Sequence, residues 1–480
     1  VALQAQDYTA SGRVALFTCN ADGTLTFQKT FVVGVQPDMV TFTPDGSKIL
    51  TADEGEPREG YGEGIVDPAG SVSVIDAATG EVAVLGFDKF DAQTLADQGV
   101  LMGKVDGQLN SAAVDLEPEY ITVAQDGNTA YVTLQEANAI ATIDLITMEI
   151  TKVQSLGFAD LSLEENAIDV EDDGQYAPVT LQNAVAAYMP DGIASYTVNG
   201  KTYLVTANEG DAREWGDYCN EAKEKLTTTN GVETNKVRVL DQDLVAVPDE
   251  SKNYLFGGRG FTIFDADTME LVYSSANEME VLTAKYLPDY FNCSNDNVAL
   301  DDRSQKKGPE VESVTLGQVG DATYAFVGLE RIGGVMVYDV TDPANVSYVN
   351  YINSRDFSGD IAGDDSPEGL CFIPAAEGRD ALLLTACEVS GTVAVYGVSE
   401  NASVPETPEN PGDPDIPGTD PEQPTDGQPD GTPGQDAETE IPQEGSVQTG
   451  DLASPFAWIA LAVLAAGSGT LLVMKRRKNH

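Results

Sequence analysis

The chain has 480 residues, of which 26 are Lys or Arg and 79 are Asp or Glu, so its formal net charge at pH 7 is -53. A nucleic-acid-binding surface needs clustered basic side chains, so this composition argues against DNA or RNA and favours cations or basic partners. The one histidine is His480, the last residue, which excludes Ser-His-Asp and Cys-His nucleophiles and His-ligated zinc from the folded body before it. Solubility of a secreted protein is an equally good interpretation of the acidity.

The first predicted elements are two strands within residues 13–34, joined by an Asn-Ala-Asp-Gly turn. They match the outer two strands of a four-stranded unit that repeats along the chain. A ring of such units cannot close on half a unit. We therefore expect a removed signal peptide and at least one further unit before Val1.

Five four-stranded units follow, each with a short first strand that opens on an acidic residue next to proline and a glutamate after the second strand. Their third strands also match, from SVSVID at 71–76 to TVAVYGV at 392–398. Self-similarity of four short strands at irregular spacing predicts radial repetition. The expected fold of residues 1–399 is therefore all-β, a β-propeller with five complete blades and half of another. A β-sandwich with chance similarity is the alternative.

The strand order places ten acidic residues at one mouth of the predicted propeller. The start of a first strand and the end of a second strand are neighbours in an antiparallel pair, and first strands line the central channel. The first-strand acids are Asp38, Glu119, Asp191, Glu310 and Glu368, and the second-strand acids are Glu54, Glu136, Glu209, Glu330 and Glu388. Converging carboxylates raise one another's pKa values, and Ca²⁺ held by oxygen ligands would relieve this repulsion. The alternative is that each acid caps its own strand.

The long connections lie at the same end of the strands, and function usually resides on such loops. Four arginines there are candidate handles for a phosphate or carboxylate group: Arg213, Arg303, Arg331 and Arg355. Such arginines more often pair with neighbouring acids, which is the interpretation we favour.

Five cysteines fit an oxidising compartment weakly. Cys371 and Cys387 lie on two strands of one hairpin and would face each other if the turn centres on Arg379. Cys219 and Cys293 both lie in long loops at the mouth and form a second candidate disulfide. Buried free thiols are the alternative for both pairs.

After residue 399 the composition changes. Residues 400–446 are rich in Pro, Asp and Gly and predict a disordered, wall-spanning linker. Residues 452–474 form an uncharged apolar run long enough to span a bilayer as one transmembrane helix, and the basic tail after it predicts an extracellular propeller with a cytoplasmic C-terminus.

Residues 447–480 resemble a Gram-positive sortase sorting signal, because they contain a threonine-glycine pair, an apolar span and a basic tail in that order. The resemblance implies a sortase-type transpeptidase and the cell wall as partners, with cleavage between Thr449 and Gly450. The sequence departs from the usual pattern because Ser446 and Val447 stand in place of Leu-Pro. A permanent single-pass membrane protein is the alternative.

Several long motifs resemble the choice-of-anchor I domain family, which is similar to mesenchyme-specific cell-surface glycoproteins. These motifs include DMVTFTPDG with DEGEP, ANEGDAREW and YAFVGLERIGGVMVYDV, and the resemblance covers about residues 12–398. It implies a seven-bladed β-propeller on an exported protein whose surface attachment varies among members, and it implies no secure activity. Val311 departs from the family pattern, which places a second proline beside the acidic pair.

Binding is the function that these observations favour. The expected protein is a monomeric, surface-anchored β-propeller that binds an unknown extracellular ligand at an acidic, calcium-containing mouth. A calcium-dependent phosphoesterase is the alternative from the enzyme class, because bound metal ions can orient a phosphate and activate water without histidine. A rigid spacer with no ligand of its own is the third interpretation.

Overall fold

The computed structural model describes residues 1–399, and most of their regular structure is β-strand. The helices of this part are short and lie in connections: α1 (Ala92–Asp97), α2 (Ala112–Asp115), α3 (Glu278–Tyr286) and a 3-10 helix (Glu164–Asn166). None of these helices is long and apolar enough to cross a bilayer. The predicted linker, the apolar run 452–474 and the sorting residues Thr449 and Gly450 lie outside the described residues.

Four sheets consist of four antiparallel strands each, and they lie where the sequence repeats predict four-stranded units. The first two are β4 (Pro37–Phe42), β5 (Lys48–Asp53), β6 (Ser71–Asp76) and β7 (Val82–Gly86), then β10 (Ile121–Val123), β11 (Thr129–Leu134), β12 (Ala139–Asp144) and β13 (Glu149–Ser155). The next two are β16 (Ile193–Val198), β17 (Lys201–Ala207), β24 (Phe261–Asp265) and β25 (Leu271–Ser274), then β26 (Val311–Val319), β27 (Ala322–Leu329), β28 (Val335–Asp339) and β29 (Ser347–Ile352).

Two of the three-stranded sheets lie at the two ends of this series in the described residues. The C-terminal one is β30 (Pro367–Ile373), β31 (Ala381–Cys387) and β32 (Thr392–Val398), so the fifth predicted blade has three of its four expected strands here. The N-terminal one is β1 (Ala2–Leu3), β2 (Ser11–Cys19) and β3 (Leu25–Val35). The predicted N-terminal pair of strands therefore gains a third strand on its inner side.

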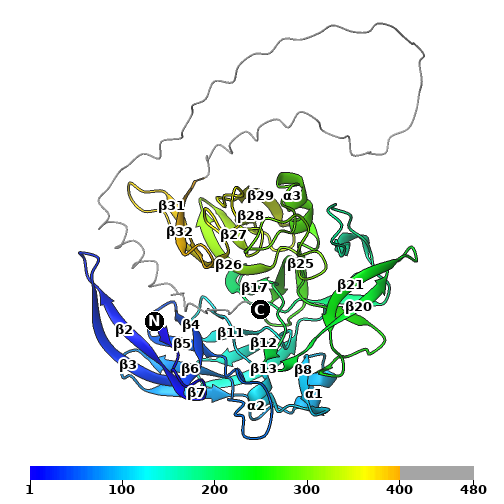
Figure 1. Cartoon of the computed structure of the whole chain (residues 1–480). Coiled ribbons are helices and arrows are strands. Elements are labelled where there is room, and N and C mark those ends of the chain that lie inside the picture. Colours follow the sequence, from blue (N-terminus) through cyan, green and yellow to red (C-terminus); the bar gives the residue numbers. More distant parts are fainter. Residues whose placement is uncertain (400–480) are drawn as a thin grey trace, which may run out of the picture.

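The sheets are arranged radially, which gives a propeller-like body. The first strands β4, β10, β16, β26 and β30 contact one another in succession. Figure 1 shows β4 and β26 toward the middle of the molecule and the last strands β7 and β29 toward its periphery. The first strands therefore lie side by side around the middle of the molecule.

The apolar cores lie between successive sheets. One core joins Leu50 and Val72 of the β4–β7 sheet to Val132 of the next sheet, and another joins Val205 to Val327 across the third and fourth sheets. Both faces of these sheets are covered, so the strands are apolar on both sides, as in β24, where every residue is buried. Each sheet thus depends on its neighbours for the burial of its faces.

The long connections carry sheets that the repeats did not predict. They are β14 (Phe158–Asp160) with β15 (Ala184–Ala187) and β23 (Asn253–Leu255), β18 (Glu214–Trp215) with β19 (Tyr218–Cys219), β20 (Glu221–Thr227) with β21 (Glu233–Leu240), and β22 (Val245–Ala246) with β8 (Met102–Val105) and β9 (Gln108–Leu109). Strands β15 and β23 pair in parallel. The long connections therefore contain small sheets of their own.

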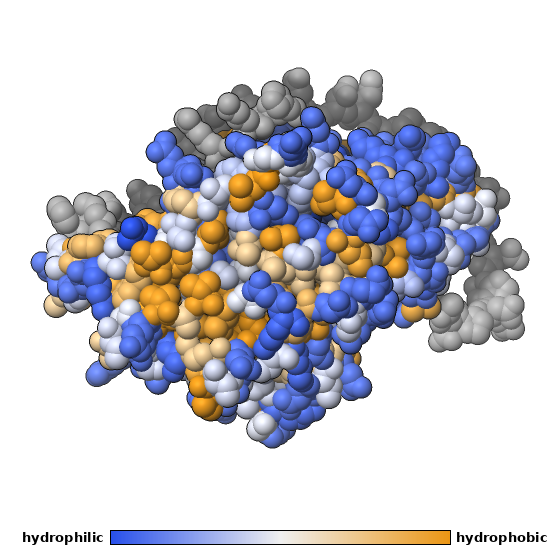
Figure 2. Space-filling view, turned by 90° about the horizontal axis from the view of Figure 1, so that it is seen from below, coloured by the Kyte–Doolittle hydropathy of each residue, from blue (hydrophilic) through white to orange (hydrophobic). Residues whose placement is uncertain are grey.

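The face of the molecule seen in Figure 2 is hydrophilic over much of its area, with hydrophobic residues gathered in patches. Figure 2 views the molecule from below Figure 1, and β3 and β7 lie near that edge in Figure 1. Val32 on β3 and Val84 on β7 are among the large apolar residues that remain exposed. Single exposed apolar residues such as these are normal on a protein surface.

A buried carboxylate fastens β3 to the β4–β7 sheet. Asp53 Oδ2 accepts hydrogen bonds from the Gly34 amide (3.2 Å) and from the Ser71 and Ser73 hydroxyls (3.1 and 2.6 Å). A Cβ atom on Gly34 would lie 2.3 Å from Ser71 Oγ and 2.5 Å from Asp53 Oδ2. Only glycine therefore fits between β3 and these side chains.

We predict that Gly34→Ala lowers the free energy of unfolding by about 1–3 kcal/mol, because the added methyl group overpacks this contact. The matched control is Gly397→Ala on β32, where an added Cβ meets no atom within 4 Å. The control should change the stability by less than about 0.5 kcal/mol. Equal effects of the two variants in denaturant unfolding would contradict the prediction.

Candidate functional site

A β-bulge recurs at the start of the first strand of the radial sheets. The register between the first and second strands shifts after Pro37, after Val311 and after Pro367. An acidic residue follows each of these positions: Asp38, Glu312 and Glu368. A bulge bends the strand and re-aims a side chain, so each of these acids leaves the regular alternation of its strand.

The other two sheets show the same feature in their hydrogen bonds. Glu119 N donates to Thr133 O, and Thr133 N donates to Tyr120 O, so two residues face one. Asp191 N donates to Ala207 O, and Ala207 N donates to Gly192 O. One acid per sheet therefore occupies a bulge, and we call these residues the bulge acids: Asp38, Glu119, Asp191, Glu312 and Glu368.

The fourth sheet corrects one predicted position, because Glu312 and not Glu310 is its bulge acid. Val311 pairs with Leu329 at the start of β26, as Pro367 pairs with Cys387 at the start of β30. Glu310 instead has a positive φ of 50° and stands two residues before Glu312. Three other residues that stand two positions before a bulge acid also have a positive φ: Gln36 (56°), Met189 (45°) and Ser366 (64°). Val311 takes the position that proline has before the other bulge acids. The sequence alignment placed Pro309 there instead, so the predicted acid was two residues too early.

The second set of acids lies just after the second strands, and we call them the loop acids: Glu54, Glu136, Glu209, Glu330 and Glu388. The amides of Glu54, Glu330 and Glu388 donate to the carbonyl groups of Gln36, Glu310 and Ser366, at 3.1, 2.8 and 2.8 Å. These bonds fix the loop acids of three sheets next to the corresponding bulges.

Two groups of three acids bring their carboxylate oxygens within 4.8 Å of one another: Asp38 with Glu54 and Glu119, and Asp191 with Glu209 and Glu312. Each group contains a bulge acid, the loop acid of the same sheet and the bulge acid of the next sheet. We call them the Asp38 trio and the Asp191 trio. All the ligand atoms they offer are carboxylate oxygens, which hard cations such as Ca²⁺ prefer.

The bulge acids influence one another across the centre of the molecule. Burial, followed by the charges of Glu54 and Glu136, raises the pKa of Glu119 well above its ordinary value. Burial and the charges of Glu388 and Asp38 raise the pKa of Glu368 to about 8. Asp38 and Glu368 belong to the first and last of these five sheets, so the bulge acids converge on one axis.

Glu310 has the opposite electrostatic environment. Arg331 Nη2 lies 2.7 Å and Lys307 Nζ lies 3.1 Å from its carboxylate, and Arg303 also pairs with it. Burial alone would raise the pKa of Glu310, but Arg331, Lys307 and Arg303 hold it well below its usual range. The acidic centre therefore has one side that the protein neutralises with its own cations.

The four candidate anion handles all pair with carboxylates. Arg213 lies 3.2 Å from Glu117 and 3.9 Å from Asp115, and its side chain is 1% exposed. Arg355 lies 3.3 Å from Asp365, and both side chains are fully buried. Arg303 and Arg331 pair with Glu310. Because burial and these partners occupy the guanidinium groups, the structure supports the ion-pair interpretation and corrects the anion-handle one.

Arg213 joins segments that are far apart in the sequence, since its Nη2 also donates to Asp115 O at 2.6 Å. Removal of this guanidinium would leave Asp115 and Glu117 buried with their main counter-charge lost. We predict that Arg213→Met lowers the free energy of unfolding by about 3–5 kcal/mol. Arg238→Met is the matched control, because Arg238 pairs with Glu221 while 29% exposed. Its loss should cost about 1 kcal/mol or less in the same unfolding experiment.

The two candidate disulfides are absent, and residues 1–399 contain no disulfide. The β30–β31 register pairs Cys371 with Leu384 and Cys387 with Pro367, because Ile373 pairs with Leu382 and the turn therefore centres before Arg379. The other candidate disulfide, Cys219 with Cys293, is also absent: Cys219 is exposed and Cys293 is buried.

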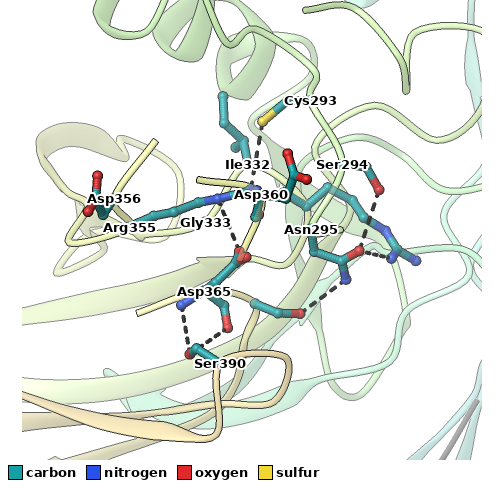
Figure 3. Close-up of polar contacts among 12 residues, drawn as sticks. Cys293, Ser294, Asn295, Ile332, Gly333, Arg355, Asp356, Asp360, Asp365 and Ser390 are labelled. Carbon is teal, nitrogen blue, oxygen red and sulfur yellow. Dashed lines mark hydrogen bonds and ion pairs between the residues drawn. The ribbon is translucent and has the colours of Figure 1, made fainter. Parts of the chain in front are cut away.

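Arg355 organises the loop between β29 and β30. Figure 3 shows its guanidinium between Cys293 and Asp365. Arg355 Nη1 donates to Arg331 O at 2.7 Å and contacts Cys293 Sγ at 3.7 Å. The Asp365 amide donates to Ser390 Oγ at 3.0 Å, which ties the same loop to the turn after β31.

Burial raises the pKa of Asp365 from 3.8 to about 7, although Arg355 opposes the shift. A carboxyl group with a raised folded-state pKa contributes stability that is present below its unfolded pKa and is lost as the pH rises through its folded pKa. We therefore predict that the protein loses stability relative to Asp365→Asn as the pH rises from 5 to 8. Unfolding curves of both proteins at several pH values test this, and a constant difference between them would contradict it.

Sequence reasoning missed one important acid of the centre, Glu312. This residue had a usable signal, because Val311-Glu312 precedes Ser-Val-Thr as Pro118-Glu119 precedes Tyr-Ile-Thr. The loop that carries Lys307 is one of the long connections expected at this end of the strands, but the sequence gives no signal for which acids Lys307 contacts.

Comparison with known proteins identifies relatives of part of the chain. Residues 1–343 match the family model of the choice-of-anchor I domain. Gigasin-3a of Magallana gigas is 30% identical over 165 residues, which are 31% of this chain and 58% of that protein. The mesenchyme-specific cell surface glycoprotein of Strongylocentrotus purpuratus is 28% identical over 158 residues, which are 30% of this chain and 18% of that protein.

The matched regions thus span less than two thirds of the length of either curated relative. Among solved structures, the periplasmic gluconolactonase of Pseudomonas aeruginosa is similar with a TM-score of 0.34 and 14% identity, over 83% of this chain and 92% of that chain.

Proposed function

Because the chain belongs to the choice-of-anchor I domain family, we propose that it is a cell-surface protein whose bulge and loop acids bind calcium and, through it, an extracellular ligand. The family assignment and the relative named as a cell surface glycoprotein support the location. The apolar run 452–474 and the basic tail after it support a membrane or cell-wall anchor. Sorting at Thr449 and a seven-bladed ring stay predictions.

The geometry of the two trios is the observation that carries the calcium proposal. Calcium binds oxygen ligands at about 2.3–2.6 Å, so two ligands on opposite sides of one ion are about 4.6–5.2 Å apart. The carboxylate oxygens of each trio lie within 4.8 Å of one another and therefore have the spacing of ligands around a single ion. Backbone carbonyl groups and water would complete the coordination.

The electrostatics of the same residues support a cation. Burial and the charges of Glu209 and Asp38 raise the pKa of Asp191 well above its ordinary value, and burial with Glu330 and Glu209 does the same for Glu312. Holding such carboxylates together costs free energy when they are ionised. A divalent ion at the centre converts this repulsion into attraction.

Binding is better supported than phosphoester hydrolysis. A phosphoesterase would need cationic side chains that face the substrate next to the metal ions. The four candidate arginines instead contact Glu117, Glu310 or Asp365 and neutralise them. The cation next to the Asp38 trio, Arg58, is itself paired with Glu54 and Glu56. The proposed role is therefore a calcium-organised surface that recognises a ligand.

We predict that millimolar calcium raises the melting temperature of the purified chain relative to EDTA. A ligand present at 100 times its dissociation constant adds about 2.7 kcal/mol to the free energy of unfolding. Glu119→Gln should remove most of this shift, because Glu119 belongs to the Asp38 trio. Glu224→Gln, at an exposed position on β20, should keep it.

A phosphatase assay on the same samples separates the two function classes. No calcium shift in the unaltered chain would refute the calcium proposal. A shift with calcium-dependent phosphate release that Glu119→Gln abolishes would replace the binding function with the phosphoesterase. A shift without phosphate release supports binding.

A further inference from the structure

A third group of carboxylates has the same spacing as the two trios but already contains a cation. The oxygens of Glu209, Glu310 and Glu330 lie within 4.8 Å of one another. Lys307 Nζ lies 3.1 Å from Glu310 and 3.4 Å from Glu209. Lys307 as a whole is 9% exposed, so this ammonium group is largely withdrawn from water.

The ammonium group also lies 3.2 Å from Asp211, in the loop after β17. These three carboxylates surround it as oxygen ligands would surround a metal ion. Arg331 and Arg303 add two further positive charges at Glu310. A divalent ion in this group would have to displace or repel three cations, which is unfavourable at short range in a poorly solvated site.

The Asp38 trio has a different environment. Arg58 reaches Glu54 at 3.8 Å while its side chain is 30% exposed, so solvent weakens that pair. Glu136 is the loop acid of the sheet that supplies Glu119 to this trio. Its side chain is 8% exposed, and its buried Oε2 accepts no hydrogen bond from the described residues.

A buried carboxylate oxygen without a donor is costly, so Glu136 independently indicates a missing partner on this side. It is also separate from the three acids that define the trio. The two sides of the centre therefore differ in their cations: buried Lys307 and Arg331 lie among the carboxylates near Glu310, whereas the cation that reaches the Asp38 trio is the partly exposed Arg58.

We infer that Lys307 is a built-in cation that takes the place of a metal ion between Glu209 and Glu310, and that the divalent ion binds on the other side, in the Asp38 trio beside Glu136. This inference rests on the proposed calcium function. Because Glu209 also belongs to the Asp191 trio, its pairing with Lys307 weakens that trio as a second metal site. Lys307 thus limits the number of metal ions that the centre binds.

The test is to count bound calcium ions per chain, by equilibrium dialysis with metal analysis, for the unaltered chain and three variants. Lys307→Gln removes the built-in cation and should let the chain bind one more calcium ion than the unaltered protein. Lys306→Gln is the matched control, because it removes the same charge one residue away, where Lys306 pairs with Asp302 at 3.2 Å. Its calcium count should equal that of the unaltered chain.

Glu54→Gln tests the location of the ion without changing Lys307. It should abolish the calcium ion of the unaltered chain, because Glu54 belongs to the Asp38 trio. If Lys307→Gln does not fold, the Glu54→Gln variant still tests where the calcium ion binds. A Glu54→Gln protein that keeps the ion would overturn the inference.

The outcomes separate this inference from the proposed function. An unaltered chain that binds no calcium refutes the proposed function and the inference together. An unaltered chain that binds calcium, with the same count for Lys307→Gln and Lys306→Gln, overturns the inference and leaves the calcium function in place.

Discussion

The fold brings the carboxylate groups of the bulge acids and loop acids close together, and their mutual repulsion is the constraint that the rest of the structure has to accommodate. A bulge in the first strand of each of five sheets aims one carboxylate at a common axis, and a loop acid follows beside it. Burial and mutual repulsion raise the pKa values of several of these groups, among them Glu330 and Glu368, each to about 8. Ionised carboxylates held this close repel one another, and protons or cations relieve that repulsion.

The repeats allowed the strands and most of the acids to be predicted, because blade-like units share a fixed order of strand, turn and acid. The start of β4 at Pro37 and the place of Glu54 after β5 follow from that order alone. The prediction was wrong at Glu310. Pro309-Glu310 has the proline and acid of the motif by chance, whereas the true position, Val311-Glu312, lacks the proline. Local sequence similarity identifies a position only when the backbone conformation is also known, and here the φ angles decided the alignment.

Other features depended on tertiary structure and had no local signal. The Cys371–Cys387 pair failed because a shift in the centre of the turn changes every cross-strand partner. The sheet formed by β14, β15 and β23 pairs Ala184 with Asn253, about seventy residues later in the chain, and this parallel pairing cannot be inferred from a repeat of antiparallel hairpins. The pairing of Lys307 with acids of the third and fourth sheets likewise depends on tertiary structure and has no local sequence signal.

The sharing of each apolar core by two successive sheets has a mechanical consequence. Inner sheets have a core on both faces, whereas β30–β32 is held to the fourth sheet by the core of Phe326, Val335, Leu370 and Leu383. Tension applied through the residues that follow Val398 reaches β32 first. A protein held at a surface and pulled by its ligand would therefore begin to yield at its C-terminal sheet, and the acidic centre would lose Glu368 before the Asp38 trio is disturbed.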